Sequence, residues 1–169
     1  MTGRELEGKC ALVTGGTRGI GKAVVFALAG MGASVAFSYR ASAAEAEAIV
    51  SELERQGAHS KAFRSELADP GAAQQLVDDV FEAFGQLDIL VNNAGLAHLQ
   101  RLGEERDYKA LDRLWAVNTL GVIATIRAAA LRRRLMPGPT PPGLGSPTRR
   151  GRGPPGRGRG RCRPRARRL

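Results

Sequence analysis

A glycine-rich turn near the start of the chain contains the residues best suited to bind a phosphate. Its sequence, TGGTRGIG over Thr14–Gly21, follows the apolar run Lys9–Thr14 and precedes a segment with helical spacing. A strand, turn and helix in this order present backbone N–H groups and a positive helix dipole to a pyrophosphate. We expect Gly15 to make the tight turn, Gly19 to permit close approach and Gly21 to allow packing of helix on strand. A purely structural turn is the alternative.

The residues after a second predicted strand, Ser34–Ser38, distinguish two nucleotide cofactors. An acidic residue there binds the ribose hydroxyl of NAD, whereas an arginine accommodates the 2′-phosphate of NADP. The segment Ser38–Ser42 reads SYRAS, without an acid, and Arg40 can pair bidentately with a phosphate. Arg18 adds a positive charge on the same side. These charges favour NADP over NAD; the alternative is that Arg40 is a solvated loop residue and Ser42 only a helix cap.

A fourth predicted strand, Asp88–Val91, leads directly into Asn92–Gly95 (NNAG). Small residues at this point leave room for an adenosine, and the asparagines can bond to backbone across the sheet. Together with the glycine turn and with Asn118 in VNTLG, these motifs resemble the short-chain dehydrogenase/reductase family. The resemblance covers about residues 5–130, the cofactor-binding half of that family. The glycine turn and the segment after the second strand look most like its 3-oxoacyl-(acyl-carrier-protein) reductases.

The resemblance implies a role for each matching position. Asn118 would be the catalytic asparagine, which kinks a long helix and positions a proton-relay water; from the residue alone, a polar side chain that satisfies local backbone is the alternative. Asn92 would stabilise the central strand, and Glu66 stands where the family commonly has an aspartate at the adenine. The implied cofactor is NADP(H), the substrate a small-molecule or acyl-thioester carbonyl, and the assembly a homo-oligomer. The implied cofactor-binding residues are Gly15, Thr17, Arg18, Gly19, Ile20, Gly21, Tyr39, Arg40, Ser42, Glu66, Leu67, Asn92, Ala94 and Gly95.

The rest of the family's catalytic set does not occur in this sequence. The family uses a tyrosine as proton donor, a lysine four residues later that lowers the tyrosine pKa, and an earlier serine, all beyond the asparagine. Both tyrosines here, Tyr39 and Tyr108, precede Asn118, and no Tyr-x-x-x-Lys occurs. Ser146 is the only serine beyond Asn118. We therefore expect the chain as written to be inactive in that reaction, which would make it an NADP-binding module without catalysis.

Alternating short and long apolar segments predict the elements that position these residues. Strands are expected at Lys9–Thr14, Ser34–Ser38, Lys61–Ser65 and Asp88–Val91. Helices are expected at Ile20–Leu28, from a Ser42/Glu45 capping box to Arg55 with a stop at Gly57, from Asp69-Pro70 to Phe84 with a stop at Gly85, and over Asp107–Leu131. Short loops between them predict a Rossmann-like, partial doubly wound α/β fold, a parallel sheet with strand order 3-2-1-4, within residues 1–136.

The charge of the chain changes abruptly beyond the last predicted helix. Residues 1–130 contain all 16 acidic residues and 13 of the 26 lysines and arginines, whereas residues 131–169 contain 13 arginines and no acid. Residues 137–169, rich in arginine, proline and glycine, are expected to be a disordered tail. One hypothesis is a frameshifted or wrongly assigned terminus of a longer reductase gene, which the coding DNA would test. Another is non-specific, salt-sensitive binding of nucleic acid through Gly151–Gly160.

Composition excludes several other classes. Two cysteines among 169 residues cannot build a disulfide framework or a multi-cysteine zinc site, so no metal is expected, and Cys10 is expected to be a small, unreactive core residue. The longest mostly apolar stretch, Ala23–Phe37, is shorter than the roughly 18–20 residues of a membrane span. The polar first residues contain no secretory signal pattern, so a cytoplasmic location is the expectation.

Overall fold

The computed structural model describes residues 4–97 and 108–135. Four parallel strands form one sheet in the order β3-β2-β1-β4, which confirms the predicted topology. The strands are β1 Cys10–Val13, β2 Ser34–Tyr39, β3 Ser60–Arg64 and β4 Ile89–Val91. Each lies within one residue of its predicted bounds. For β1 the reason is that a strand buried on both faces appears in the sequence as an unbroken apolar run, whereas β3 (SKAFR) has exposed residues and gave a weaker pattern.

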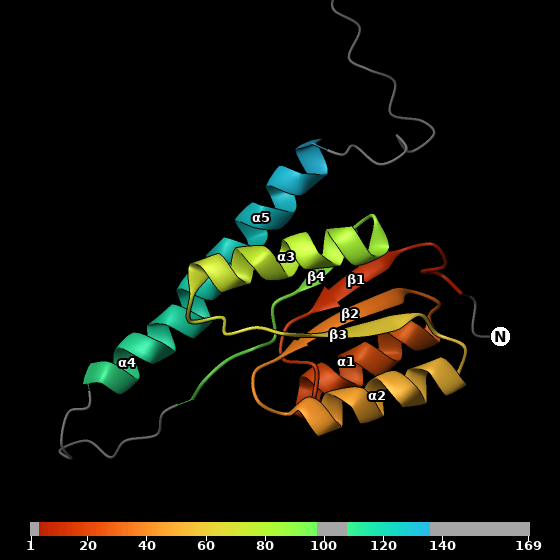
Figure 1. Ribbon diagram of the computed structural model, residues 1–169, viewed down its shortest axis with the longest axis horizontal. Coiled ribbons are helices and arrows are strands. Elements are labelled where there is room, and N and C mark those ends of the chain that lie inside the picture. The colour runs from red at the N-terminus through yellow and green to blue at the C-terminus, as the bar shows by residue number, and fades with distance from the viewer. Residues whose placement is uncertain (1–3, 98–107, 136–169) are drawn as a thin grey trace, which may run out of the picture. The chain divides into compact units, whose positions relative to one another are not determined.

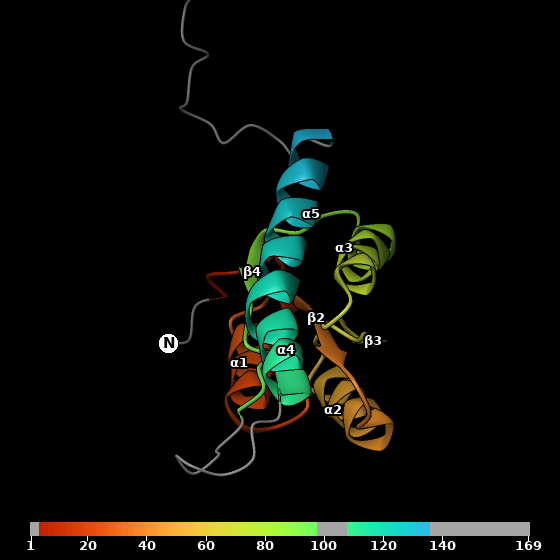
Figure 2. The same cartoon turned by 90° about the vertical axis from the view of Figure 1, so that its left-hand side faces the viewer.

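Helices cover both faces of the sheet (Figures 1 and 2). On one face lie α1 Gly19–Gly30 and α2 Ala43–Arg55. On the other lie α3 Pro70–Phe84 and a continuous helical run made of α4 Tyr108–Trp115, the π-helical turn η1 Ala116–Gly121 and α5 Val122–Leu135. The chain passes from strand to helix to strand with short loops, as a parallel sheet requires.

Two apolar layers hold this arrangement together. Successive residues of a strand point to opposite faces, so Val13 and Phe37 pack with α1 and α2, whereas Leu12 and Ala36 pack with α3 and α5. All four side chains are fully buried. The sheet is therefore a rigid base from which the loops at its carboxyl edge project.

The predicted ends of α2 and α3 agree with the structure, whereas α1 extends to Gly30 instead of Leu28 and the last helix to Leu135 instead of Leu131. The Asp69 side chain accepts a hydrogen bond from Gly71 N at 2.8 Å, and Gly57 and Gly85 have positive φ angles beyond the ends of α2 and α3. Ser42 does precede α2, but its side chain makes no capping hydrogen bond. The predicted capping box is thus wrong in its bonds, although it located the start of the helix.

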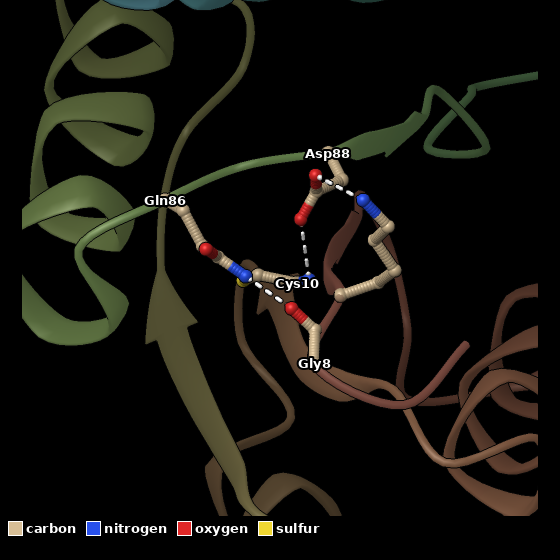
Figure 3. Close-up of polar contacts among 5 residues, drawn as sticks. Gly8, Cys10, Gln86 and Asp88 are labelled. Carbon is tan, nitrogen blue, oxygen red and sulfur yellow. Dashed lines mark hydrogen bonds and ion pairs between the residues drawn. The ribbon is translucent and has the colours of Figure 1, made fainter. Parts of the chain in front are cut away.

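Polar contacts join the amino ends of β1 and β4 (Figure 3). Asp88 accepts hydrogen bonds from Cys10 N at 2.9 Å and from Lys9 Nζ at 3.2 Å, while its own N–H donates to the Cys10 carbonyl. The Gln86 amide donates to the Gly8 carbonyl. Burial, with the nearby Asp88 charge, raises the pKa of the Cys10 thiol to about 12. The thiol is therefore protonated at neutral pH, as expected of a core cysteine.

The long helix predicted from Asp107 is described from Tyr108 and continues to Leu135. It is long and apolar enough to cross a membrane by length and composition alone. Its Thr125 and Ala128 are buried, and Ala128 belongs to the apolar layer that α3 covers. This packing ties the run to the sheet. Other apolar side chains of the run are exposed, namely Leu111, Trp115, Leu120, Ile123, Ile126, Leu131 and Leu135.

The tail predictions lie outside the described residues. They concern the boundary at residue 136, disorder over 137–169, nucleic-acid binding by Gly151–Gly160 and the position of Ser146. All of these stay predictions.

Candidate functional site

A cleft of about 720 Å³ lies at the carboxyl ends of β1, β2 and β4. Its volume falls within the roughly 300–1,000 Å³ of small-molecule and cofactor sites. It is the place where an open parallel sheet with this strand order binds its ligand, because the helices that follow the neighbouring strands β1 and β4 cover opposite faces of the sheet there. It is lined by Gly15, Thr17, Arg18, Gly19, Ile20, Gly21, Ser38, Tyr39, Arg40, Ala41, Ser42, Ser65, Glu66, Leu67, Asn93, Ala94, Gly95, Leu96 and Val117.

The glycine turn has a shape that side chains would prevent. Gly15 has a φ of 69°, and a Cβ on it would lie 3.0 Å from the Ala94 Cα. A Cβ on Gly21 would lie 2.2 Å from the Gly15 carbonyl oxygen, so α1 can approach the turn only through a glycine. Gly19, with a φ of 54°, begins α1 and faces open space. The turn is therefore both tight and accessible to a ligand.

The side chains of Thr14 and Asn93 fix this turn against the loop after β4. Thr14 Oγ1 accepts hydrogen bonds from the backbone N–H groups of Asn93 and Ala94, each at 3.0 Å. The Asn93 amide donates to the carbonyls of Thr14 and Gly15 at 3.0 and 3.1 Å. Ser38 adds a contact from β2, its hydroxyl accepting from Gly15 N. These bonds of Asn93 confirm the expectation that asparagines of the NNAG motif bond to backbone across the sheet, although Asn93 was not among the predicted cofactor-binding residues.

Two arginines lie at the rim of the cleft and form no ion pair with a described residue. Arg18 directly precedes α1 and Arg40 directly follows β2, and both are exposed. Among the described residues, no hydrogen bond or ion pair engages either guanidinium. The first turn of α1 has no acidic residue. The start of this helix and both cations thus produce a positive potential that suits a phosphorylated ligand.

Glu66 and Leu67 lie across the cleft from the glycine turn, in the loop between β3 and α3. Leu67 is buried, and the Glu66 carboxylate pairs with the guanidinium of Arg113 in α4 at 2.7 Å. Glu66 also accepts a hydrogen bond from Ala68 N at 3.3 Å. The ion pair with Arg113, which no local sequence pattern indicated, connects the helical run to this side of the cleft.

Asn118 lies in the π-helical turn, where the helical run was predicted to be irregular. Its amide pairs with both backbone groups of Leu96, accepting from N and donating to O at 2.8 Å each. The side chain thus satisfies backbone groups, but it is exposed and its partner lies 22 residues away, so it is not the buried residue bonded to local backbone of the alternative. The contacts fix the loop that follows Gly95. Nothing in the described residues tests the catalytic role that the resemblance implied for Asn118.

Asn92 is the one predicted cofactor-binding residue that does not line the cleft. Its Oδ1 accepts a hydrogen bond at 2.8 Å from the hydroxyl of Thr125, which is fully buried in α5. Successive side chains alternate in direction at the end of a strand, so Asn93 turns toward the glycine turn while Asn92 turns toward α5. This bond agrees with the role of stabilising the strand that the resemblance implied for Asn92, while its place among the cofactor-binding residues stays a prediction.

The family model for short chain dehydrogenases matches residues 9–135. The chain belongs to the short-chain dehydrogenase family. All of the motifs that suggested it lie within this range, and the glycine turn, the NNAG segment and Asn118 surround the same cleft or fix its walls.

Individual members of the short-chain dehydrogenase family resemble the chain over the same residues. The 3-oxoacyl-(acyl-carrier-protein) reductase FabG of Staphylococcus aureus is 38% identical over 132 residues, which cover 75% of this chain and 52% of that protein. A short chain dehydrogenase from Burkholderia cenocepacia, solved in complex with NADP, is 46% identical with a TM-score of 0.72 and covers 75% of this chain and 51% of that one.

A third member is the blue fluorescent protein from a metagenomic library, solved in complex with NADPH. It is 39% identical with a TM-score of 0.72, over 75% of this chain and 52% of that one. The chain thus spans about half the length of the family members it matches. The matching half is the one that carries the glycine turn and the cleft.

Proposed function

We propose that residues 9–135 bind a nicotinamide dinucleotide and prefer NADP(H) to NAD(H). The observation that carries the proposal is the cleft, in which the glycine turn, the start of α1 and two guanidinium groups without acidic partners surround one space. A helix start favours the pyrophosphate, and arginine favours the extra phosphate of NADP. The two structurally similar proteins solved with NADP or NADPH support the choice.

The residues present fit such a cofactor. Gly15 and Gly19 leave the backbone of the turn uncovered, so N–H groups at the start of α1 would hold the pyrophosphate. Arg18 and Arg40 would hold the adenosine 2′-phosphate, and Glu66 and Leu67 would bound the adenine. A bound nicotinamide supplies or accepts a hydride. The residues named here bind and orient the cofactor; none of them transfers a proton.

We further propose that the lineage reaction is reduction of a carbonyl, of the 3-oxoacyl thioester type, as the name of the Staphylococcus aureus relative suggests. That reaction needs a proton donor beside the carbonyl oxygen. Neither Tyr39 nor Tyr108 has a lysine four residues later, since positions 43 and 112 are alanine and aspartate. The 169-residue chain on its own is therefore proposed to bind the cofactor without reducing a carbonyl. We also propose that the protein is cytoplasmic and that its lineage reaction belongs to fatty acid biosynthesis.

Titration of the purified full chain with NADPH and, in parallel, with NADH tests the proposal. Fluorescence of the bound dihydronicotinamide should rise with NADPH at lower concentrations than with NADH. A 3-oxoacyl thioester added to the NADPH complex should leave the cofactor unoxidised. The binding proposal would be overturned if a chain with helical circular dichroism bound no NADPH at millimolar concentration. Steady oxidation of NADPH after addition of the thioester would overturn the proposed inactivity.

A further inference from the structure

The last residues of β2 and β3 are neighbours in the sheet. The two strands pair in parallel with Tyr39 opposite Arg64, so Arg64 lies beside the chain just before it leaves the sheet at Arg40. The backbone ladder ends one step later, where Ser65 N donates to the Tyr39 carbonyl at 2.8 Å. Beyond this point the strands no longer hold the backbone of the Arg40 loop.

The side chain of Arg64 continues the ladder by one more bond. Its Nε donates to the Arg40 carbonyl oxygen at 3.2 Å. A hydrogen bond to this carbonyl restrains the peptide plane after Arg40, and with it the direction in which the Arg40 side chain leaves the backbone. Arg64 therefore restrains the position of Arg40 already in the ligand-free chain.

A second, smaller hollow of about 400 Å³ lies next to the cleft, and Arg40 lines both. Arg64 lines the smaller hollow together with two acids, Glu66 and Asp79. Glu66 is paired with Arg113, and Asp79 accepts a hydrogen bond from Gln75. The Arg113 charge offsets that of Glu66, whereas Asp79 keeps its negative charge, so Arg40 and Arg64 together leave this border with an excess of one positive charge.

We infer that Arg64 is a positioning residue for Arg40 and thereby sets the preference for the adenosine 2′-phosphate of NADP(H) over the free hydroxyl of NAD(H). The inference rests on the proposed function, because it requires a dinucleotide in the cleft. Arg64 acts through the Arg40 backbone, whereas Arg40 makes the contact with the phosphate.

The substitution Arg64→Met tests this, since methionine keeps an unbranched side chain but has no donor and no charge. The loss of one hydrogen bond is expected to weaken NADPH binding roughly two- to tenfold and to leave NADH binding unchanged. Lys61→Met is the matched control, because it removes the same charge from the same strand at its other end. It should change neither affinity. Arg64→Lys should recover part of the loss, because an ammonium can still donate to the carbonyl.

The double variant distinguishes positioning from direct contact. In an Arg40→Ala background, Arg64→Met should have little further effect on NADPH binding, because the group it positions is gone. Full additivity would show that Arg64 contacts the phosphate itself and would overturn the inference. An equal loss for NADPH and NADH, or no loss for either, would also overturn it. Failure of the proposed function would look different, because the unaltered chain itself would then bind no NADPH.

Discussion

At the amino ends of β1 and β4, polar groups pair with one another, whereas at the carboxyl edge of the sheet, beyond β1 and β2, two cations have no partner among the described residues. Asp88 satisfies Cys10 N and Lys9 at one end. At the other end the two cations are Arg18 and Arg40. Polar groups that bond one another, as around Asp88, stabilise the fold. Charged groups without a partner, such as the two guanidinium groups, are available to bind a ligand of opposite charge.

The polar groups at the carboxyl end are also divided by task. The Thr14 hydroxyl accepts hydrogen bonds from the backbone of the loop after β4, and the Asn93 NH2 group donates to the backbone of the glycine turn, so these groups hold the two segments together. The guanidinium groups of Arg18 and Arg40, by contrast, bond to no described residue. The comparison therefore predicts that substitutions at the amino end change stability alone, while substitutions at the carboxyl end change binding.

The largest effect is expected for Gly21→Ala, which would place a methyl group 2.2 Å from the Gly15 carbonyl oxygen. The turn and α1 must separate, so NADPH binding should be lost at concentrations that saturate the unaltered chain. The free energy of unfolding should fall by about 1–3 kcal/mol. Gly30→Ala is the control, because nothing lies within 4 Å of a Cβ there. NADPH titration and thermal unfolding measure both quantities; normal binding by Gly21→Ala would contradict the account of the turn.

Arg40→Ala should follow in size. Removal of a charged donor from a phosphate is expected to weaken NADPH binding by about ten- to a hundredfold, while NADH binding and thermal stability stay the same. Titrations with both cofactors give the ratio. Arg55→Ala, in the last turn of α2, removes the same charge away from the cleft and should leave the ratio unchanged. A parallel loss for both cofactors would show that Arg40 supports the loop instead of reading the phosphate.

Asp88→Ala should change stability without changing binding. It leaves the Cys10 N–H without its acceptor, and we expect the free energy of unfolding to fall by about 1.5–3 kcal/mol. Urea unfolding measures this, with Glu47→Ala on the exposed side of α2 as a control for loss of one negative charge. A reduced NADPH affinity in a folded Asp88→Ala chain would break the proposed separation between the two ends of the sheet.

The effect that is smallest at neutral pH concerns the pH dependence of stability, since it arises only in alkaline solution. The pKa of Cys10 is raised to about 12 in the folded chain from an ordinary value near 9, so the folded state binds this proton more tightly. Its contribution is fully present below pH 9 and is lost as the pH rises toward 12. The free energy of unfolding should therefore fall more steeply over this pH range for the unaltered chain than for Cys10→Ala. Parallel pH profiles for the two chains would contradict the buried thiol.

Local patterns predicted the strands, the glycine turn and most helix ends because their causes are local. An apolar run, a glycine before a helix and an Asp-Pro pair each act through residues adjacent in sequence. The same reasoning expected both asparagines of NNAG to bond backbone across the sheet, whereas only Asn93 does so and Asn92 bonds Thr125, since the direction of a side chain at a strand end depends on the last residue of the ladder. It also placed a capping bond at Ser42 that the structure does not contain.

From the sequence alone came the family, the strand order, the glycine turn and the two arginines of the rim. These depend on residue type and on spacing within short segments. Only the tertiary structure decided which polar groups are already engaged: Glu66 by Arg113, Asn92 by Thr125, and the Arg40 backbone by Arg64. Each of these contacts joins residues more than 20 positions apart, and the sheet register and helix packing that bring them together are properties of the folded chain.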